Sequence, residues 1–288
     1  MASPAQAKVG LGAASPASTG ITPENYTYLQ QIVYKDSGIV LEHNKHYLLE
    51  SRLHPIVKRE QLASLDDLCN RLRCEPKPVL RKNVVEAMTT NETLFFRDRA
   101  PFDALRDHLV PKLQTMRAQT KKLSFWSAAS SSGQEAYSLA ILLLELGLRD
   151  WKIEIVGTDL SGQMVERARL GKYMQIEVNR GLPAPYLVKY FVRDGMNWQL
   201  KPEVRNMVRF QTFDLRQSLR QLGTFDVVFC RNVLIYFDVD TKRQILAEIC
   251  KVMNPGGYLV LGGAETTVNL NDRLKRTPIG QAVFYENS

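Results

Sequence analysis

The order of apolar and polar positions near the start of the chain is helical, with no strand-type alternation before about residue 88. It predicts four helices, at residues 23–36, 45–60, 65–73 and 79–88. The first begins with Thr22 as N-cap, Pro23 at the first helical position and Glu24 near the positive end of the helix dipole. Residues 21–88 are therefore predicted to form an all-α domain.

After about Lys121 short apolar runs alternate with amphipathic helices. Strands are predicted at residues 123–128, 152–158, 208–213, 225–230 and 258–262, and helices at 134–147, 162–170 and 240–252. Strands separated by helices favour a parallel, doubly wound α/β sheet. Two strand-like pieces around Pro278-Ile279-Gly280, within residues 273–286, predict a closing hairpin.

One interval is too long for a simple connection. The segment from about residue 172 to 206 separates a helix from the next strand, where about 2–6 residues normally suffice. It contains a predicted helix at residues 183–192 and a glycine turn at Gly195 that could feed a strand. We interpret it as a small inserted subdomain within a second domain at residues 101–288, which a linker at 89–100 joins to the helical domain.

Composition narrows the class of protein. The chain has 288 residues, of which 44% are hydrophobic and 24% charged, as in globular proteins with a substantial core. No apolar run approaches the length of about 20 residues that spans a bilayer.

Residues 1–20 are rich in Ala, Ser, Pro and Gly, which predicts a disordered tail and not a signal peptide. The four cysteines form no zinc or disulfide pattern, so we expect a protein of the reducing cytoplasm. The net charge of +8 suits an acidic partner.

The candidate site lies at the carboxyl ends of the predicted strands, where open parallel sheets bind ligands. The first strand runs into small residues and a helix start at 127–135, without GxGxxG or GKS/T. Asp159 follows the second strand, Asp214-Leu215 the third, and Asn232 the fourth. Asp159 is placed to bind a ribose diol, although it could simply precede the Ser161 cap of the next helix. Together these features suggest S-adenosylmethionine more than NAD or ATP.

Three sequence blocks resemble the signatures of the CheR family of chemotaxis receptor methyltransferases. They are NETLFFRD at residues 91–98, SAASSSGQEAYS at 127–138 and FCRNVLIYF at 229–237. The likeness extends from about residue 22 to the end of the chain, and the blocks keep the family's order and spacing. It implies an S-adenosylmethionine-dependent methyltransferase domain of Rossmann-like fold, with an inserted small β-subdomain, after an all-α domain.

The resemblance also implies an activity and its residues. The enzyme would esterify specific glutamate side chains on the cytoplasmic helices of chemoreceptors, leaving S-adenosylhomocysteine and using no metal. Glu135 would meet the methionine amino group, Asp159 the ribose and Asp214-Leu215 the adenine. The full set of cofactor-binding candidates is Asn91, Thr93, Arg97, Glu135, Asp159, Asp214, Leu215, Asn232 and Val233.

Arg97 and Tyr236 are the catalytic candidates. The Arg97 guanidinium could orient the carboxylate of the substrate or of the cofactor, or it could form a linker salt bridge with Asp98. Tyr236 could line the methyl-donor end or be an ordinary core aromatic. A glutamate carboxylate is already ionised at neutral pH, since its reference pKa is about 4.3, so no general base is expected.

The helical domain is the candidate for receptor binding. Residues 45–82 carry nine basic and five acidic side chains, and Lys45, Arg52 and Arg59 recur every seven residues on one predicted helix face. Such a stripe suits acidic receptor helices, but it could also be a solvated face. Some family members use the inserted subdomain to grip a receptor C-terminal pentapeptide. The turn at residues 193–196 is short by comparison, so we expect no dependence on that peptide.

Two other functions stay open. The sequence pI of about 9.3 fits a nucleic-acid methyltransferase, although residues 231–234 lack the prolines of an amino-group enzyme. A catalytically idle S-adenosylmethionine sensor would bind cofactor without turnover. No heptad pattern or exposed apolar stripe indicates an oligomer, so a monomer is expected.

Overall fold

The structure is a computed structural model that describes residues 20–42, 45–75 and 77–287. All but the last residue of the tail predicted at residues 1–20 lies outside these ranges. No helix in the described ranges is long and apolar enough to cross a membrane.

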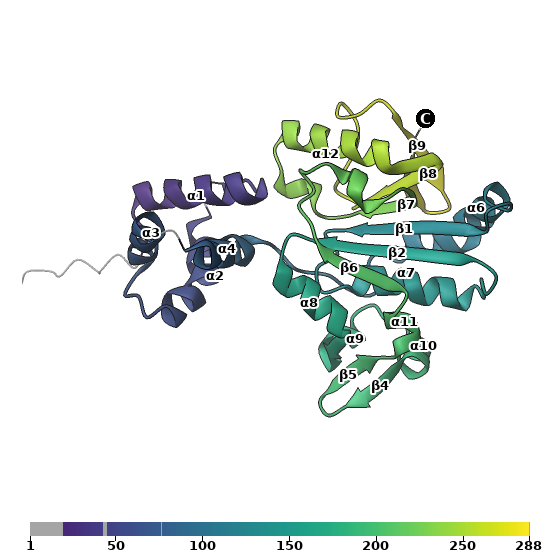
Figure 1. The fold of residues 1–288 in the computed structure, drawn as a ribbon, viewed down its shortest axis with the longest axis horizontal. Helices are drawn as coiled ribbons and strands as arrows, with labels where there is room; N and C mark the ends of the chain where they lie inside the picture. The colour runs from purple at the N-terminus through teal and green to yellow at the C-terminus, as the bar shows by residue number, and fades with distance from the viewer. Residues whose placement is uncertain (1–19, 43–44, 76, 288) are drawn as a thin grey trace, which may run out of the picture.

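The first domain is a helical bundle (Figure 1). Its helices are α1 (Pro23–Ser37), α2 (His46–Arg59), α3 (Leu65–Cys74) and α4 (Pro78–Met88), which confirms the four predicted helices. Their core is built from fully buried side chains such as Leu29, Val33, Leu53, Leu68 and Val84.

The start of α1 differs from the prediction in one detail. Thr22 does occupy the N-cap position and Pro23 follows it, but the threonine side chain does not cap α1. Its hydroxyl donates instead to Asp66 Oδ1 at 3.0 Å, and its backbone N–H donates to the same oxygen at 3.1 Å. Thr22 therefore ties the beginning of α1 to the first turn of α3.

The second domain is built on a seven-stranded sheet in the order β6-β2-β1-β7-β8-β10-β9. Strands β1, β2, β6, β7 and β8 pair in parallel, and β10 is antiparallel to both of its neighbours. The predicted doubly wound α/β sheet and its closing hairpin are confirmed. The strands are β1 (Lys122–Ala128), β2 (Lys152–Asp159), β6 (Val208–Thr212), β7 (Phe225–Cys230), β8 (Met253–Leu261), β9 (Leu274–Ile279) and β10 (Ala282–Asn287).

Helices cover both faces of this sheet, and each face has its own apolar core. One core includes side chains of α7 (Gln134–Glu145) and α8 (Gly162–Leu170). It also includes side chains of three consecutive helical segments, α5 (Ala100–Ala104), η1 (Leu105–Leu109) and α6 (Val110–Met116). The sequence predicted no helix in the stretch that these three segments occupy. The other contains α12 (Val239–Val252) and η2 (Leu219–Leu222). Two further short helices are α11 (Pro202–Arg205) and η3 (Leu234–Tyr236).

The long interval between α8 and β6 forms a small antiparallel sheet in the order β3-β5-β4. Its elements are β3 (Lys172–Met174), α9 (Gln175–Asn179), α10 (Ala184–Tyr190), β4 (Phe191–Asp194) and β5 (Asn197–Leu200). The helix predicted at residues 183–192 was two residues too long at its end, because Phe191 and Val192 pair with β5.

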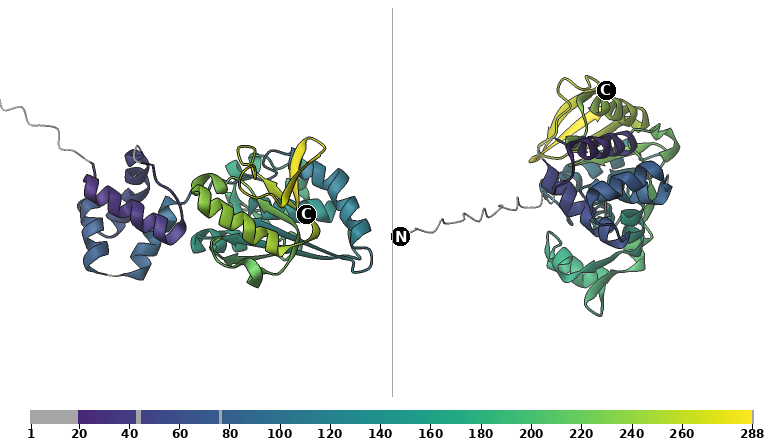
Figure 2. Two further views of the ribbon diagram at one scale, coloured as in Figure 1. Left: turned by 90° about the horizontal axis from the view of Figure 1, so that it is seen from above. Right: turned by 90° about the vertical axis from the view of Figure 1, so that its left-hand side faces the viewer.

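The helical domain lies at the carboxyl-end edge of the sheet, where the arrowheads of β1 and β2 point in Figure 1. Figure 2 shows the same end-to-end arrangement from above. Six hydrogen bonds among the described residues cross between the domains there. They are Glu86 to Ser161 and Gly162, Arg216 to the carbonyls of Tyr34 and Lys35, Tyr34 to Asp238, and Val40 to Tyr236.

Candidate functional site

A narrow cavity of about 60 Å³ lies where the strand ends meet the helical domain. It is much smaller than a typical ligand pocket of about 300–1,000 Å³, so side chains or domains must move apart to admit a nucleoside. Both domains contribute to its wall. The lining residues are Ser37, Ile39, Thr89, Ala129, Asp159, Leu160, Phe213, Asp214, Leu215, Val233, Tyr236 and Phe237.

Asp159 ends β2 and is buried in the wall of this cavity. Its Oδ2 accepts the backbone N–H of Ser131 at 2.8 Å, and its Oδ1 accepts that of Ser161 at 2.9 Å. Burial raises the pKa of Asp159, against these backbone donors, which lower it. The two oxygens offer four lone pairs, more than the backbone donors use, so the carboxylate can still accept from a diol. Asp159 thus both precedes the Ser161 cap and faces the cavity.

Asp214 and Leu215 follow β6 and line the same cavity. Arg216 holds the Asp214 carboxylate through Nε at 3.0 Å and Nη2 at 2.6 Å. The Nη1 of Arg216 reaches the carbonyls of Tyr34 and Lys35 at the end of α1, at 3.3 and 3.1 Å. This arginine therefore links the predicted adenine contact to the helical domain, a role that the sequence did not indicate.

Glu135 lies in the first turn of α7, where the helix dipole favours a carboxylate. Its Oε1 accepts from the Ser127 hydroxyl at 2.8 Å and its Oε2 from Nη1 of Arg231 at 3.0 Å. The Arg231 side chain is only 1% exposed and also pairs with Asp98 at 2.6 Å. Sequence reasoning missed Arg231 as a site residue, although it stands in the third signature block beside Asn232.

The linker approaches the site through Asn91, whose carbonyl accepts from the Ser131 hydroxyl at 2.8 Å. Thr93 and Arg97 are both half-buried. Arg97 donates to the Glu92 carbonyl at a long 3.4 Å, and within the described ranges it forms no ion pair. The salt bridge between Arg97 and Asp98 that the sequence left open is absent there, because Asp98 pairs with Arg231 instead.

The loop after β7 carries three further candidates. Asn232 has a left-handed backbone with φ of 57°, and the backbone N–H groups of Asn232 and Val233 both donate to Glu265. Tyr236 is half-buried, lines the cavity and packs against the core of the helical domain. It therefore lies between the domains, and not inside the α/β core.

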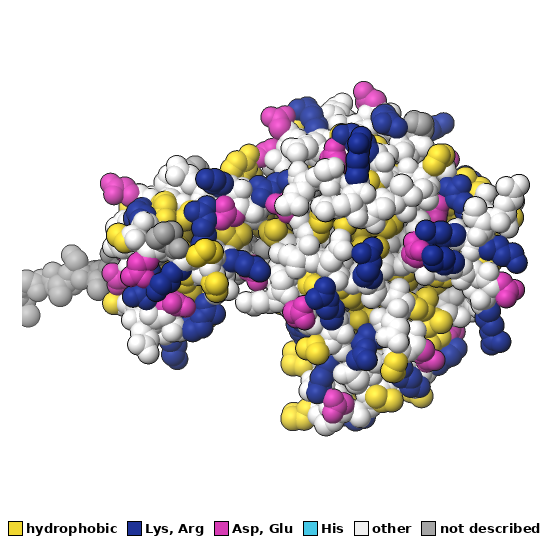
Figure 3. All heavy atoms as spheres, in the orientation of Figure 1, with side chains coloured by type: hydrophobic (Ala, Val, Ile, Leu, Met, Phe, Trp, Pro, Cys, Tyr) yellow, Lys and Arg dark blue, Asp and Glu magenta, His cyan; other side chains and the backbone are white. Residues whose placement is uncertain are grey.

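The three basic substrate candidates do not share a free face. Lys45 precedes α2 and pairs with Glu42 at 3.2 Å, and the exposed Arg59 pairs with Glu60 at 3.4 Å. Arg52 turns inward, where its Nη1 donates to the carbonyls at the end of α4 and its Nη2 to the Thr90 hydroxyl at 2.9 Å. Burial lowers the pKa of Arg52. On the face seen in Figure 3, Lys and Arg side chains are spread over both domains among acidic ones.

The buried polar atoms without a partner indicate where a ligand would fit. Four such side-chain atoms occur in the described part of the chain, and three lie just after β1 and β7, where the strand order reverses. They are Ser130 Oγ, Arg231 Nε and Asn232 Oδ1. Unpaired buried polar groups are costly, so their concentration at this point fits a polar ligand. With the carboxylates and apolar walls nearby, the residue chemistry fits S-adenosylmethionine. The described ranges contain no cluster of His, Cys, Asp or Glu that could hold a metal ion.

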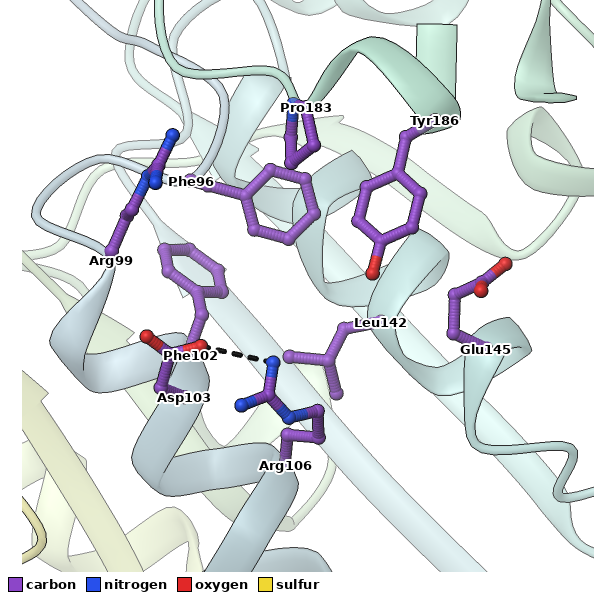
Figure 4. Close-up of a pocket in the computed structure, with 9 residues that line it drawn as sticks. All are labelled: Phe96, Arg99, Phe102, Asp103, Arg106, Leu142, Glu145, Pro183 and Tyr186. Carbon is purple, nitrogen blue, oxygen red and sulfur yellow. Dashed lines mark ion pairs between the residues drawn. The ribbon is translucent and has the colours of Figure 1, made fainter. Parts of the chain in front are cut away.

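A separate pocket of about 220 Å³ lies beside the inserted subdomain (Figure 4). The rings of Phe96, Phe102 and Tyr186 face it, and Arg106 pairs with Asp103 at its lower edge. None of the predicted site residues lines it. The strand-end cavity, and not this pocket, is therefore the candidate cofactor site.

Comparison with known proteins shows which family the chain resembles. Residues 91–283 match the model of the CheR methyltransferase SAM-binding domain, and residues 24–89 match that of the CheR methyltransferase all-alpha domain. Chemotaxis protein methyltransferase Cher2 of Pseudomonas putida is 41% identical over 258 residues, covering 88% of this chain and 94% of that protein. Chemotaxis protein methyltransferase 1 of Pseudomonas aeruginosa is 42% identical over 87% of this chain and 93% of its own length. The protein of the same name from Vibrio cholerae is 39% identical, over 92% and 98%.

Proposed function

We propose that this chain, which belongs to the CheR methyltransferase family, methylates glutamate side chains of chemoreceptors with S-adenosylmethionine. The product would be a glutamyl methyl ester, as in chemotaxis adaptation. The observation that carries the proposal is the match of both family domains, in order, over nearly the whole described chain. The strand-end carboxylates and unpaired polar atoms add a site of suitable chemistry.

The chain's residues have to bind and orient the reactants. S-adenosylmethionine supplies an electrophilic methyl group on a sulfonium. Glu135, oriented by hydrogen bonds from Ser127 and Arg231, would hold the amino end of the methionine moiety. Asp159 would accept from the ribose diol, while Asp214 and Leu215 form the wall for the base.

The reacting end of the site needs orientation and exclusion of water more than proton transfer. The substrate carboxylate is already ionised, and correct placement of reactants can supply about 7–11 kcal/mol of the barrier. Tyr236, Asn232 and Val233 would surround the methyl-donor end. Arg97, which has no ion-pair partner in the described part of the chain, would orient a carboxylate of the substrate or of the cofactor.

The helical domain would contact the acidic methylation region of the receptor, and the enzyme would act as a cytoplasmic monomer. Its exposed side chains Lys58 and Arg59, and the half-buried Lys45, are available for that contact. Arg52 is a weaker candidate than the sequence suggested, because its guanidinium already binds the end of α4 and the linker.

We also propose that the enzyme does not need a receptor C-terminal pentapeptide. The β4–β5 hairpin pairs Asp194 with Asn197, which leaves only Gly195 and Met196 in its turn. A turn of this length offers little surface for gripping a peptide. Micromolar affinity for a receptor C-terminal pentapeptide in a titration would contradict this proposal.

The main proposal is tested with S-adenosylmethionine labelled on its methyl group, purified protein and receptor-containing bacterial membranes. We expect label in the receptor that mild alkali releases as methanol. Alkali-stable label would indicate a nitrogen or carbon acceptor and favour a nucleic-acid or lysine methyltransferase. Cofactor binding with no transfer to any of several receptors would favour the idle sensor.

A further inference from the structure

The loop that follows β7 is held by a carboxylate from a different strand end. Glu265, located after β8, accepts the backbone N–H groups of four consecutive residues. The donors are Asn232 to Oε2 at 2.7 Å, and Val233, Leu234 and Ile235 to Oε1 at 2.9, 2.7 and 3.3 Å. The N–H of Gly262 also donates to Oε2 at 2.7 Å.

The bonds to Glu265 supply acceptors for backbone N–H groups that have none within the loop itself. Asn232 has a left-handed φ of 57°, and η3 begins two residues later at Leu234. The first N–H groups of a helical turn have no partner within it, and several turned toward one point are satisfied by an anion. Glu265 is itself fixed, because its backbone N–H donates to the Gly262 carbonyl at 2.9 Å.

Gly262 leaves the space that this arrangement needs. A Cβ at this position would lie 2.6 Å from Asn232 Nδ2, 2.9 Å from Asn232 N and 2.8 Å from Glu265 Oε2. Contacts below 3.0 Å would push the loop and the carboxylate apart. The adjacent Gly263 faces open space, with nothing within 4 Å of its Cβ position.

We propose that Glu265 is a positioning residue for methyl transfer, and this inference rests on the function proposed above. It does not line the cavity that Asp159 and Tyr236 share. It acts through the loop, by fixing Asn232, Val233 and Tyr236 relative to the strand ends. A misplacement of about 1 Å in a catalytic site can cost about 100-fold in rate, so loss of this anchor should affect turnover far more than binding.

The test compares Glu265→Gln, Glu265→Asp and Gly262→Ala with the control Gly263→Ala. The glutamine keeps one acceptor oxygen but replaces the other with a donor, so it cannot accept all five N–H groups. We expect about a 100-fold lower kcat for Glu265→Gln, with cofactor Kd changed by less than about threefold. Glu265→Asp should recover part of the activity, Gly262→Ala should resemble Glu265→Gln, and Gly263→Ala should match the wild type.

A second readout does not depend on activity. Backbone hydrogen exchange at residues 232–235 should be about tenfold faster in folded Glu265→Gln, because each amide loses a charge-assisted bond. Unchanged exchange, or a wild-type kcat in a folded Glu265→Gln, would overturn the positioning role. Equal losses of kcat and cofactor binding would also overturn it, in favour of general structural damage. Absence of methyl transfer by the wild type would contradict the proposed function and with it a role in methyl transfer, and the exchange result would then show only whether Glu265 anchors the loop.

Discussion

The strand-end loops of the α/β domain and helix α2 of the helical domain both carry residues that the sequence assigned to the site, but the structure uses them differently. Glu135 in the first turn of α7 and Asp159 at the end of β2 are buried and accept hydrogen bonds from β1 and from the loops around them. Around α2, Arg52 turns into the protein, while Lys45 and Arg59 pair with acids beside them in the sequence.

The difference follows from geometry. The carboxyl ends of parallel strands meet at one edge of a sheet whatever their side chains are, so residues after strands converge once the topology is known. The direction of a helix side chain depends on how the whole helix is rotated against its neighbours. A spacing of seven residues predicts that side chains share a face, but not whether that face is exposed.

The largest effect should come from breaking the strand-end network at Glu135. Glu135→Ala leaves the buried Arg231 with Asp98 as its remaining acid, and removing one partner of a buried pair costs about 3–5 kcal/mol. We expect that loss in the free energy of urea unfolding, and loss of S-adenosylmethionine binding by calorimetry. The matched control is Glu166→Ala in α8, which breaks an exposed pair with Arg169 and should cost about 0–1 kcal/mol. Equal losses in both variants would contradict the comparison.

A smaller effect should separate Arg52 from Arg59. Arg52→Ala removes charged hydrogen bonds to the α4 carbonyls and Thr90, and should cost about 1.5–3 kcal/mol of unfolding free energy. Arg59→Ala should stay within about 0.5 kcal/mol of the wild type, as an exposed substitution does. If Arg59 contacts the receptor as proposed, Arg59→Ala should weaken methylation of receptor membranes. The effect should be largest at low salt, because salt screens attraction between exposed charges. Thermal or chemical unfolding of the two variants, beside a methylation assay, measures both effects.

The smallest effect concerns the protonation of Asp159. Burial raises the pKa of Asp159 in the folded protein above the usual 3.8. The protonated form therefore adds to the free energy of unfolding, fully so at a pH below the unfolded-state pKa. This contribution is lost as the pH rises through the folded-state pKa. We therefore expect the wild type to lose unfolding free energy relative to Asp159→Asn as the pH rises through that window. Cofactor affinity should change in the opposite sense, falling as acid protonates the carboxylate. A difference in unfolding free energy that does not vary with pH would show that Asp159 titrates normally.

Much of the architecture could be predicted from the chain. The four helices near the start, the parallel strands and the closing hairpin follow from local patterns of apolar residues. The helices bury apolar side chains at helical spacing, whereas central strands such as β7 are short apolar runs buried on both faces. Boundaries were less certain, as at Phe191, where pairing with Leu200 ends α10 early. That pairing joins residues on two different strands, so no local pattern contains it.

The sequence by itself determined the order of the elements, the polar residues that follow the strands and the three blocks that resemble the CheR family. Only the tertiary structure decided which of these residues meet. Arg231 and Glu135 are separated by 96 positions, and Glu265 and Asn232 by 33, yet each pair is in direct contact. The inward turn of Arg52 was likewise decided by the packing of α2 against α4. Periodicity records how a residue relates to its near neighbours along the chain, whereas these partners are chosen by the way separate elements pack together.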